Sequence, residues 1–244
     1  MPCGLFHTRY RTDERVFQTI WVRSWIAGLG LFVLLLPFFA SGYILYVANT
    51  IFIFIVGAIG LNILTGFTGQ ISIGHGAFVA IGAYSSAIIT TKLNLPFWLA
   101  MPAGGLSAAL IGMVFGIPSL RVKGLYLAIA TLAAQFITDY TIVHWESLTN
   151  GITGMFVPSP DLFGFVFDSD RKYYYLLLVF AAVAVVSGRN LFRTRIGRAL
   201  IAVRDRDIAA ELIGISLFKY KLLAFALSSF YAGIAGGLWG FYTN

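Results

Sequence analysis

The sequence has 244 residues, of which 59% are hydrophobic and only 11% are charged, and its formal net charge is +7. Soluble domains carry about 25% charged residues, so the composition excludes an ordinary soluble enzyme or binding module. The single cysteine, Cys3, excludes an internal disulfide, and because no Cys/His spacing indicates a metal site, we expect neither a metal nor a cofactor.

From Ser24 to Thr91 the chain contains no Asp, Glu, Lys or Arg. About 20 apolar residues are enough to cross a bilayer, so this stretch alone has room for about three crossings. A membrane β-barrel would show alternating segments of about 10 residues, and the unbroken apolar runs argue against it. The sequence therefore predicts an all-α, polytopic membrane protein, with an N-terminal tail (1–23) followed by one transmembrane domain (24–244).

About seven spans are expected along the chain, at residues 24–40, 43–61, 74–91, 96–117, 125–143, 173–188 and 221–241. The first apolar run continues far beyond the length of a signal peptide and meets no A-x-A-like cleavage site, so we expect a retained helix. Because the chain stops at Asn244, directly after the last expected span, it is compatible with a C-terminally truncated protein.

Positive charge orients these spans, because Lys and Arg collect in cytoplasmic loops. With the N-terminus inside, only Lys92, Arg171 and Lys172 of the 17 Lys and Arg fall on the outer side. The same effect explains the net positive charge without a nucleic-acid partner. The cytoplasmic segments are then the N-terminal tail and residues 62–73, 118–124 and 189–221.

The segment TGFTGQISIGHGAF, Thr65 to Phe78, interrupts the apolar sequence with four glycines and several polar side chains. Each glycine destabilises a helix by about 1 kcal/mol relative to alanine, so we expect an interrupted helix near 62–76. Irregular backbone at membrane depth is tolerated where it is buried in protein or lines a water-filled cavity, and transporters build substrate sites from interrupted helices. The candidate pathway residues are Thr65, Gly66, Thr68, Gly69, Gln70, Ser72, Gly74, His75 and Gly76.

Two interpretations of this segment stay open. It borders a translocation pathway, or it is a glycine-rich turn whose small residues allow close helix packing. His75 by itself is better interpreted as a hydrogen-bonded structural residue than as a proton carrier.

A second polar stripe lies on the expected fifth span. Thr131, Gln135 and Asp139 are spaced i, i+4, i+8 and so share one helix face. An intramembrane acid is a candidate functional residue, so all three are candidates for the pathway. Because Asp139 falls near the outer end of its span, anchoring at the membrane interface is an equal alternative.

The basic loop 189–221 is too polar to span a membrane, yet Ile208, Leu212 and Ile215 recur at helical spacing. We expect a short cytoplasmic helix at about 207–213, with Asp205 or Asp207 as its N-cap and Gly214 as its left-handed stop. Acidic residues on its polar face disfavour contact with anionic lipid. The pattern therefore favours docking in a groove on a partner protein.

Three blocks carry a family resemblance: GLNILTGFTGQISIGHGAFVAIGAY, PSLRVKGLYLAIATLA and RTRIGRALIAVRDRDIAAELIGISLFKYKLLAF. They resemble the LivM-type permease subunit of bacterial branched-chain amino acid ABC transporters, over roughly residues 55–244. The segment IAAELIG is similar to the cytoplasmic EAA loop of ABC importers, with Ile208 at the position where that loop has Glu. The residues that this resemblance places at the ATPase are Arg204, Asp205, Asp207, Ile208, Ala209, Ala210, Glu211, Leu212 and Gly214.

The resemblance implies a permease without enzymatic activity of its own, in the bacterial inner membrane with a cytoplasmic N-terminus. It implies four kinds of partner. These are a second, LivH-like permease, two cytoplasmic ATPase subunits, a periplasmic substrate-binding protein and the lipid bilayer that surrounds the permeases. The family continues with further spans after the coupling loop.

Several alternatives remain at this stage. Related permeases carry urea, amides or aromatic acids, and a pathway of hydroxyls and helix ends suits these as well as leucine, isoleucine or valine. A self-contained secondary transporter would be expected to hold charged or coordinating groups near mid-membrane, and only Asp139, near one end of its span, fits this weakly. A membrane enzyme would need a cluster of catalytic groups, and the chain shows neither such a cluster nor a phosphate-binding loop.

Overall fold

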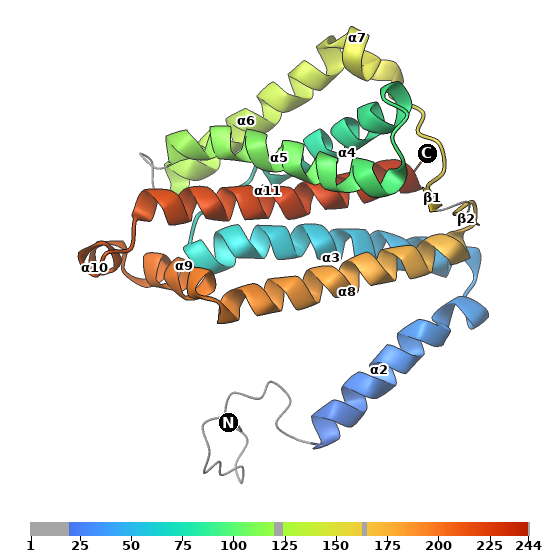
Figure 1. Ribbon diagram of the computed structural model, residues 1–244, viewed down its shortest axis with the longest axis horizontal. Coiled ribbons are helices and arrows are strands. Elements are labelled where there is room, and N and C mark those ends of the chain that lie inside the picture. The colour runs from blue at the N-terminus through green and yellow to red at the C-terminus, as the bar shows by residue number, and fades with distance from the viewer. Residues whose placement is uncertain (1–19, 120–123, 163–164, 244) are drawn as a thin grey trace. The chain divides into compact units, whose positions relative to one another are not determined.

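The computed structural model describes residues 20–119, 124–162 and 165–243. They are helical almost throughout (Figure 1), apart from loops and one antiparallel pair of two-residue strands, β1 (Asp161–Leu162) and β2 (Phe165–Val166). The all-helical prediction is thereby confirmed. Most of the expected N-terminal tail and the two basic residues Arg121 and Lys123 lie outside the described residues.

The chain divides into two compact units, with Leu45 ending the first and Tyr46 beginning the second. In the first unit, α2 (Ile20–Phe39) contains Pro37 near its end. Its apolar part, Ser24–Phe39, is shorter than the helices that reach membrane-spanning length.

The second unit is a bundle of long helices connected by short elements. The long helices are α3 (Gly42–Thr68), α4 (His75–Lys92), α5 (Phe97–Ser119), α6 (Leu125–His144), α8 (Asp170–Arg193) and α11 (Leu217–Tyr242). The short ones are α7 (Glu146–Thr149), a 3-10 turn (Gly151–Thr153), α9 (Arg195–Asp205) and α10 (Asp207–Leu212).

Five helices in the described part of the chain are long and apolar enough to cross a membrane by length and composition: α3, α5, α6, α8 and α11. The seven expected segments all coincide with helices, but α4 and the apolar part of α2 are not among the five. The count of about seven spans therefore stays a prediction.

The helix interruption is shorter than expected. α3 continues to Thr68, because Ile63 and Leu64 are fully buried and tertiary burial outweighs the low helix propensity of Gly66. The hydroxyls of Thr65 and Thr68 bond to carbonyls one turn earlier, at 2.9 and 2.5 Å. The irregular segment is therefore residues 69–74, which we call the break.

α11 is the central helix of the second unit, between α4 and α5 on one side and α3 and α8 on the other (Figure 1). Glycines allow the closest crossing: a Cβ on Gly82 would collide with the backbone of Gly233. On the other side, Ile53 of α3, Leu177 of α8 and Leu238 of α11 belong to one buried apolar cluster. This packing holds both ends of the break against the bundle.

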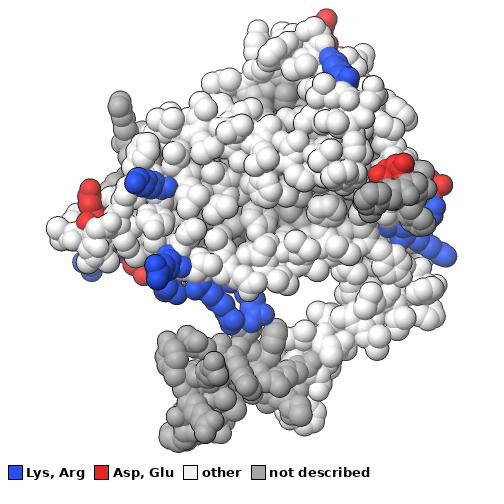
Figure 2. All heavy atoms as spheres, in the orientation of Figure 1, with Lys and Arg blue, Asp and Glu red and all other residues white. Residues whose placement is uncertain are grey.

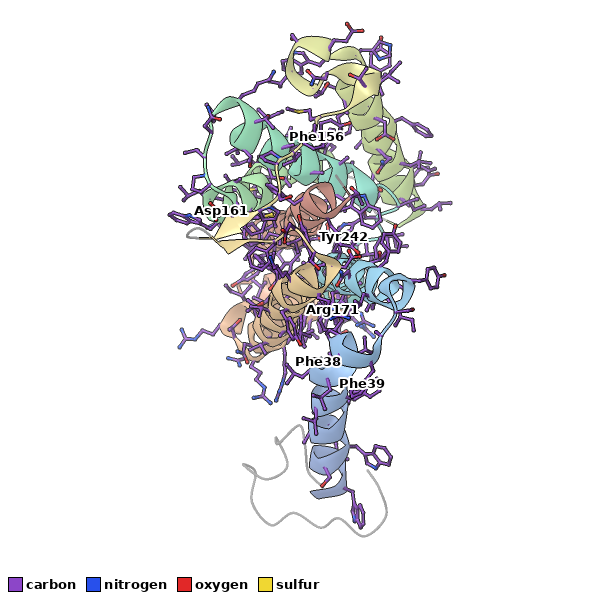
Figure 3. The ribbon with its side chains drawn as sticks, turned by 90° about the vertical axis from the view of Figure 1, so that its right-hand side faces the viewer. Phe38, Phe39, Phe156, Asp161, Arg171 and Tyr242 are labelled. Carbon is purple, nitrogen blue, oxygen red and sulfur yellow. The ribbon has the colours of Figure 1, made fainter. Side chains whose placement is uncertain are left out.

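The two ends of the second unit collect different segments. α9, α10 and the end of α3 lie at one end, which we call the α10 end, and the strands and α7 lie at the other (Figure 1). On the face in Figure 2, charged side chains gather at the ends and uncharged residues fill the middle. Figure 3 looks onto the strand end, where Asp161, Arg171 and Tyr242 lie. The segments 62–73 and 189–221 therefore share one end, as expected, and the assignment of that end to the cytoplasm stays a prediction.

Candidate functional site

The break begins where α3 ends at Thr68. Gly69 has φ +67°, a left-handed conformation that a residue with a Cβ adopts only with strain. The chain then folds back, so that the Gln70 backbone N–H donates to the Leu64 carbonyl at 3.1 Å. The Gln70 side chain is 5% exposed, and its Nε2 donates to the Thr68 hydroxyl at 3.0 Å. The polar side chain thus turns inward at the end of the helix.

Thr131 of α6 fixes the other end of the break. Its hydroxyl accepts the backbone N–H groups of Ile73 at 3.1 Å and Gly74 at 3.4 Å, and donates to the Ala128 carbonyl at 2.9 Å. A Cβ on Gly74 would collide with the Thr131 carbonyl. Two residues that the sequence proposed separately are therefore in direct contact.

Three polar atoms in the break or directly after it are buried and have no hydrogen-bond partner among the described residues: Gln70 Oε1, Ser72 Oγ and, at the start of α4, His75 Nδ1. His75 uses its other ring nitrogen, Nε2, which lies 3.2 Å from the Gly57 carbonyl, in agreement with a structural role. Buried polar groups in proteins are nearly always paired. The break therefore retains unused hydrogen-bonding capacity inside an apolar bundle.

The predicted polar stripe on α6 becomes more exposed along its length. Thr131 is buried, Gln135 is half-buried and Asp139 is exposed. Gln135 Nε2 donates to both carboxylate oxygens of Asp139 at 3.2 Å. A Cβ on Gly76 would lie 3.0 Å from Gln135 Oε1. The stripe thus leads from the break to an exposed acid.

The basic loop contains two helices where the sequence predicted one. Thr194 caps α9 by accepting the Gly197 N–H at 3.2 Å, and Leu200 and Val203 bury its apolar face. The signal was present in the sequence as a threonine cap followed by Ala199, Leu200 and Val203 at helical spacing. α9 attaches the loop to the bundle.

α10 occupies the place of the expected short helix, 207–213, and ends at Leu212. Gly214 has φ +87°; its N–H donates to the Glu211 carbonyl, and the Ile215 N–H donates to the Ala210 carbonyl, both at 3.0 Å. This pair of bonds is the Schellman motif. The predicted left-handed stop at Gly214 is confirmed by this geometry.

The predicted N-cap of α10 is wrong. Asp205 is the last residue of α9, Asp207 is already inside α10, and Arg206 occupies the cap position. The reason is the close succession of two helices, which leaves one residue between them. Asp207 Oδ1 accepts the N–H of Ile208, its direct neighbour, at 2.9 Å.

The exposure of α10 residues separates those that can contact a partner from those that cannot. Ile208 and Leu212 are 73% and 84% exposed, and Ala209 and Glu211 are exposed as well. Ala210 is 3% exposed, packed against its own chain. A contact with another protein would therefore use Ile208 and Leu212.

The break and the basic loop meet at the α10 end. Arg204 Nη1 donates to the Gly66 carbonyl at 2.7 Å across 138 positions of sequence. A cleft of about 300 Å³ lies beside this bond, and its lining includes Thr68 at the end of α3, residues 69–70 of the break and residues 204–207 of the loop. The sequence placed these two groups in separate candidate sites, and the fold makes them neighbours.

Residues 43–244 match the protein family described as branched-chain amino acid transport system / permease component. The chain belongs to this family. The family match includes the whole second unit, with the break, the α6 stripe and the basic loop.

Individual proteins with similar sequences are also transport permeases. The high-affinity branched-chain amino acid transport system permease protein LivM of Escherichia coli strain K12 is 33% identical, over 91% of this chain and 58% of the relative. LivM of Salmonella typhimurium strain LT2 is 34% identical, over 83% of this chain and 53% of the relative. The ribose import permease protein RbsC of Haemophilus influenzae is 28% identical, over 82% of this chain and 61% of the relative. The chain spans little more than half the length of the LivM relatives, and no solved structure matches it.

Proposed function

We propose that the chain is the transmembrane permease subunit of an ABC importer that carries the branched-chain amino acids leucine, isoleucine and valine. The observation that carries the proposal is the break together with the residue that follows it: a polar segment with unused hydrogen-bonding capacity at Gln70, Ser72 and His75, inside an apolar bundle of this permease family. Irregular polar backbone at membrane depth fits a translocation pathway. The substrate class rests on the names of the LivM relatives.

The pathway would run along the break and the α6 stripe. Thr131 holds the break in place, and Gln135 and Asp139 continue its polar surface. A zwitterionic amino acid needs polar partners without net charge, which amide, hydroxyl and backbone groups supply. The same groups would suit urea, amides or sugars, so the substrate is the first property to measure.

Energy would come from partner ATPase subunits docked on α10. Ile208 and Leu212 present exposed apolar side chains at the end of the bundle that carries the basic loop, and burial of such side chains against a partner is favourable. The complete transporter would contain this chain, a LivH-like permease, two ATPases and a periplasmic binding protein. It would lie in the bacterial inner membrane with about seven spans in this chain and a cytoplasmic N-terminus.

The proposal is tested with the assembled transporter in proteoliposomes, by uptake of labelled leucine and competition by isoleucine, valine, ribose, guanosine and urea. Uptake should require ATP, and isoleucine and valine should compete. Competition by ribose or urea alone would reassign the substrate. No ATP-dependent uptake of any of these solutes would contradict the permease function.

Two variants test the break itself. Gly69→Val strains the left-handed turn and Gln70→Leu removes its buried amide, so each should lower uptake at normal subunit abundance. Thr50→Val is the matched control, because that hydroxyl bonds only within its own helix. Unchanged uptake in both break variants would favour a packing turn over a pathway.

A pair of exposed apolar residues tests the docking of the ATPase. Ile208→Asp and Leu212→Asp should reduce co-purification of the ATPase and uptake together. Ile152→Asp is the control, because Ile152 is 91% exposed but lies in the 3-10 turn beside α7, far along the chain from α10. Full co-purification with both α10 variants would contradict docking there. Ala210→Glu is not suitable, because burial of Ala210 makes that variant a probe of folding.

A further inference from the structure

One carbonyl at the end of α3 lacks its helical partner. In a continuous α-helix the Gly66 carbonyl would accept the N–H of Gln70. Here the Gln70 N–H donates to the Leu64 carbonyl instead, because Gly69 turns the chain back. Arg204 Nη1 supplies the missing donor at 2.7 Å. A distant arginine therefore completes the last turn of the helix before the break.

The Arg204 side chain does more than donate one bond. A Cβ built on Gly69 would lie 3.3 Å from Arg204 Cγ, so the aliphatic stem of the arginine covers the turn itself. The guanidinium also places a positive charge at the C-terminal end of α3, where the helix dipole favours a cation. One side chain of α9 thus lies against the turn of the break.

Arg204 also stands next to α10. It lies in the last turn of α9, and Arg206 alone separates that helix from α10. α9 packs against the bundle, because Leu200 is fully buried and Val203 is 4% exposed. Ala210 is likewise buried, so a displacement of α10 would be passed to α9 through packed contacts. The arginine is the point where α9 touches the break.

We propose that Arg204 is a positioning residue that transmits movement of the α10 coupling helix to the break. The proposal rests on the proposed docking of an ATPase on α10, and it goes beyond docking because the Arg204 guanidinium donates to a carbonyl of its own chain. When α10 and α9 shift, the bond to the Gly66 carbonyl and the contact with Gly69 move the end of α3. The polar side chains that follow, from Gln70 onward, then change their position relative to α6.

The effect of the bond on the turn is tested without any partner protein, by hydrogen exchange of the Gln70 backbone amide in the purified chain, because this amide closes the turn beside Arg204 by donating to the Leu64 carbonyl. Arg204→Ala should raise the exchange rate about tenfold, as expected when a charged hydrogen bond is lost. Arg204→Lys should restore most of the protection, because it keeps a positive donor. Arg195→Ala is the control: Arg195 is an exposed arginine at the other end of α9. Equal exchange in wild type and Arg204→Ala would overturn the proposal.

Transmission is tested in the assembled transporter by the leucine carried per ATP hydrolysed. Arg204→Ala should lower this ratio by at least about fivefold, within the usual range of coupling between sites, while the ATPase still co-purifies. Arg204→Lys should recover the ratio, and Arg204→Gln, which keeps a donor without the charge, should recover part of it. If Arg204→Ala fails to fold, the transport ratios of Arg204→Lys and Arg204→Gln test the proposal in its place.

The outcomes separate the two proposals. Loss of ATPase co-purification in Arg204→Ala would make Arg204 a docking residue and overturn its positioning role. An unchanged transport ratio, or no recovery by lysine, would overturn it as well. Full co-purification with Ile208→Asp and Leu212→Asp would instead contradict the docking of the ATPase, and the hydrogen-exchange result for Arg204 would still stand.

Discussion

The Thr131 hydroxyl of α6 lies 3.4 Å from the backbone nitrogen of Gly74 and accepts its N–H just before α4 begins. The same oxygen accepts the N–H of Ile73. Thr131→Val keeps the shape of the side chain and removes the acceptor, so two N–H groups of the break lose their partner. A buried group left unpaired costs about 1–3 kcal/mol. We expect a lower midpoint of thermal unfolding in detergent and reduced uptake by the assembled transporter.

Two further variants complete this test. Thr131→Ser keeps the acceptor and should retain most of the stability and uptake. Thr141→Val lies on the same helix, but its hydroxyl is exposed and bonds only to the Ile137 carbonyl, so it should behave as wild type. A Thr131→Val protein as stable and as active as wild type would mean that Thr131 does not hold the break.

A pair of glycines predicts where added volume is tolerated. A Cβ on Gly233 would lie 2.6 Å from Ala108 Cβ and 2.9 Å from the Gly104 carbonyl, so α11 and α5 must separate. Overpacking of this kind costs about 1–3 kcal/mol. A Cβ on Gly57 meets Ala235 at 3.6 Å, an ordinary contact. Gly233→Ala should therefore lower the free energy of unfolding, and Gly57→Ala should leave it equal or higher. A similar loss of unfolding free energy in both variants would show that the crossing of α11 and α5 adjusts to the added methyl group.

The sequence predicted elements whose signals are local. α10 and its stop at Gly214 follow from residues within one short segment, and the break follows from glycines close together in an apolar run. The α9 helix was missed although Thr194 and Leu200 carry its pattern, because the arginines between them were interpreted as a topology signal.

Contacts between distant segments could not be predicted in the same way. The Arg204–Gly66 bond joins residues 138 positions apart, and no local pattern of either residue indicates the other. The same holds for Asn49, which is fully buried and donates to Tyr242 and to the Asp170 carbonyl, both at 3.2 Å. Such bonds depend on how the helices pack against one another. The sequence pattern predicts where the helices are but not how they pack.

Gly214 should be replaceable by residues that tolerate a left-handed backbone. No atom lies within 4 Å of a Cβ built on Gly214, so the cost of a side chain there is conformational. Gly214→Ala should therefore destabilise the end of α10 by about 1 kcal/mol. Gly214→Asn should cost less, because asparagine adopts this conformation more readily. ATPase co-purification should fall more for alanine than for asparagine, and the reverse order would contradict the role of the Schellman motif.

The orientation of the chain can be measured at two serines that cap helices at opposite ends of the bundle. Ser169 precedes α8 at the strand end and Ser216 precedes α11 at the α10 end, and both are exposed. With Cys3→Ser as background, a membrane-impermeant maleimide should label Ser169→Cys in intact cells. Ser216→Cys should react only after the cells are permeabilised, because the α10 end carries most of the Lys and Arg in the part of the chain that the structure describes. The opposite pattern would place α10 outside the cell, where no ATPase could dock.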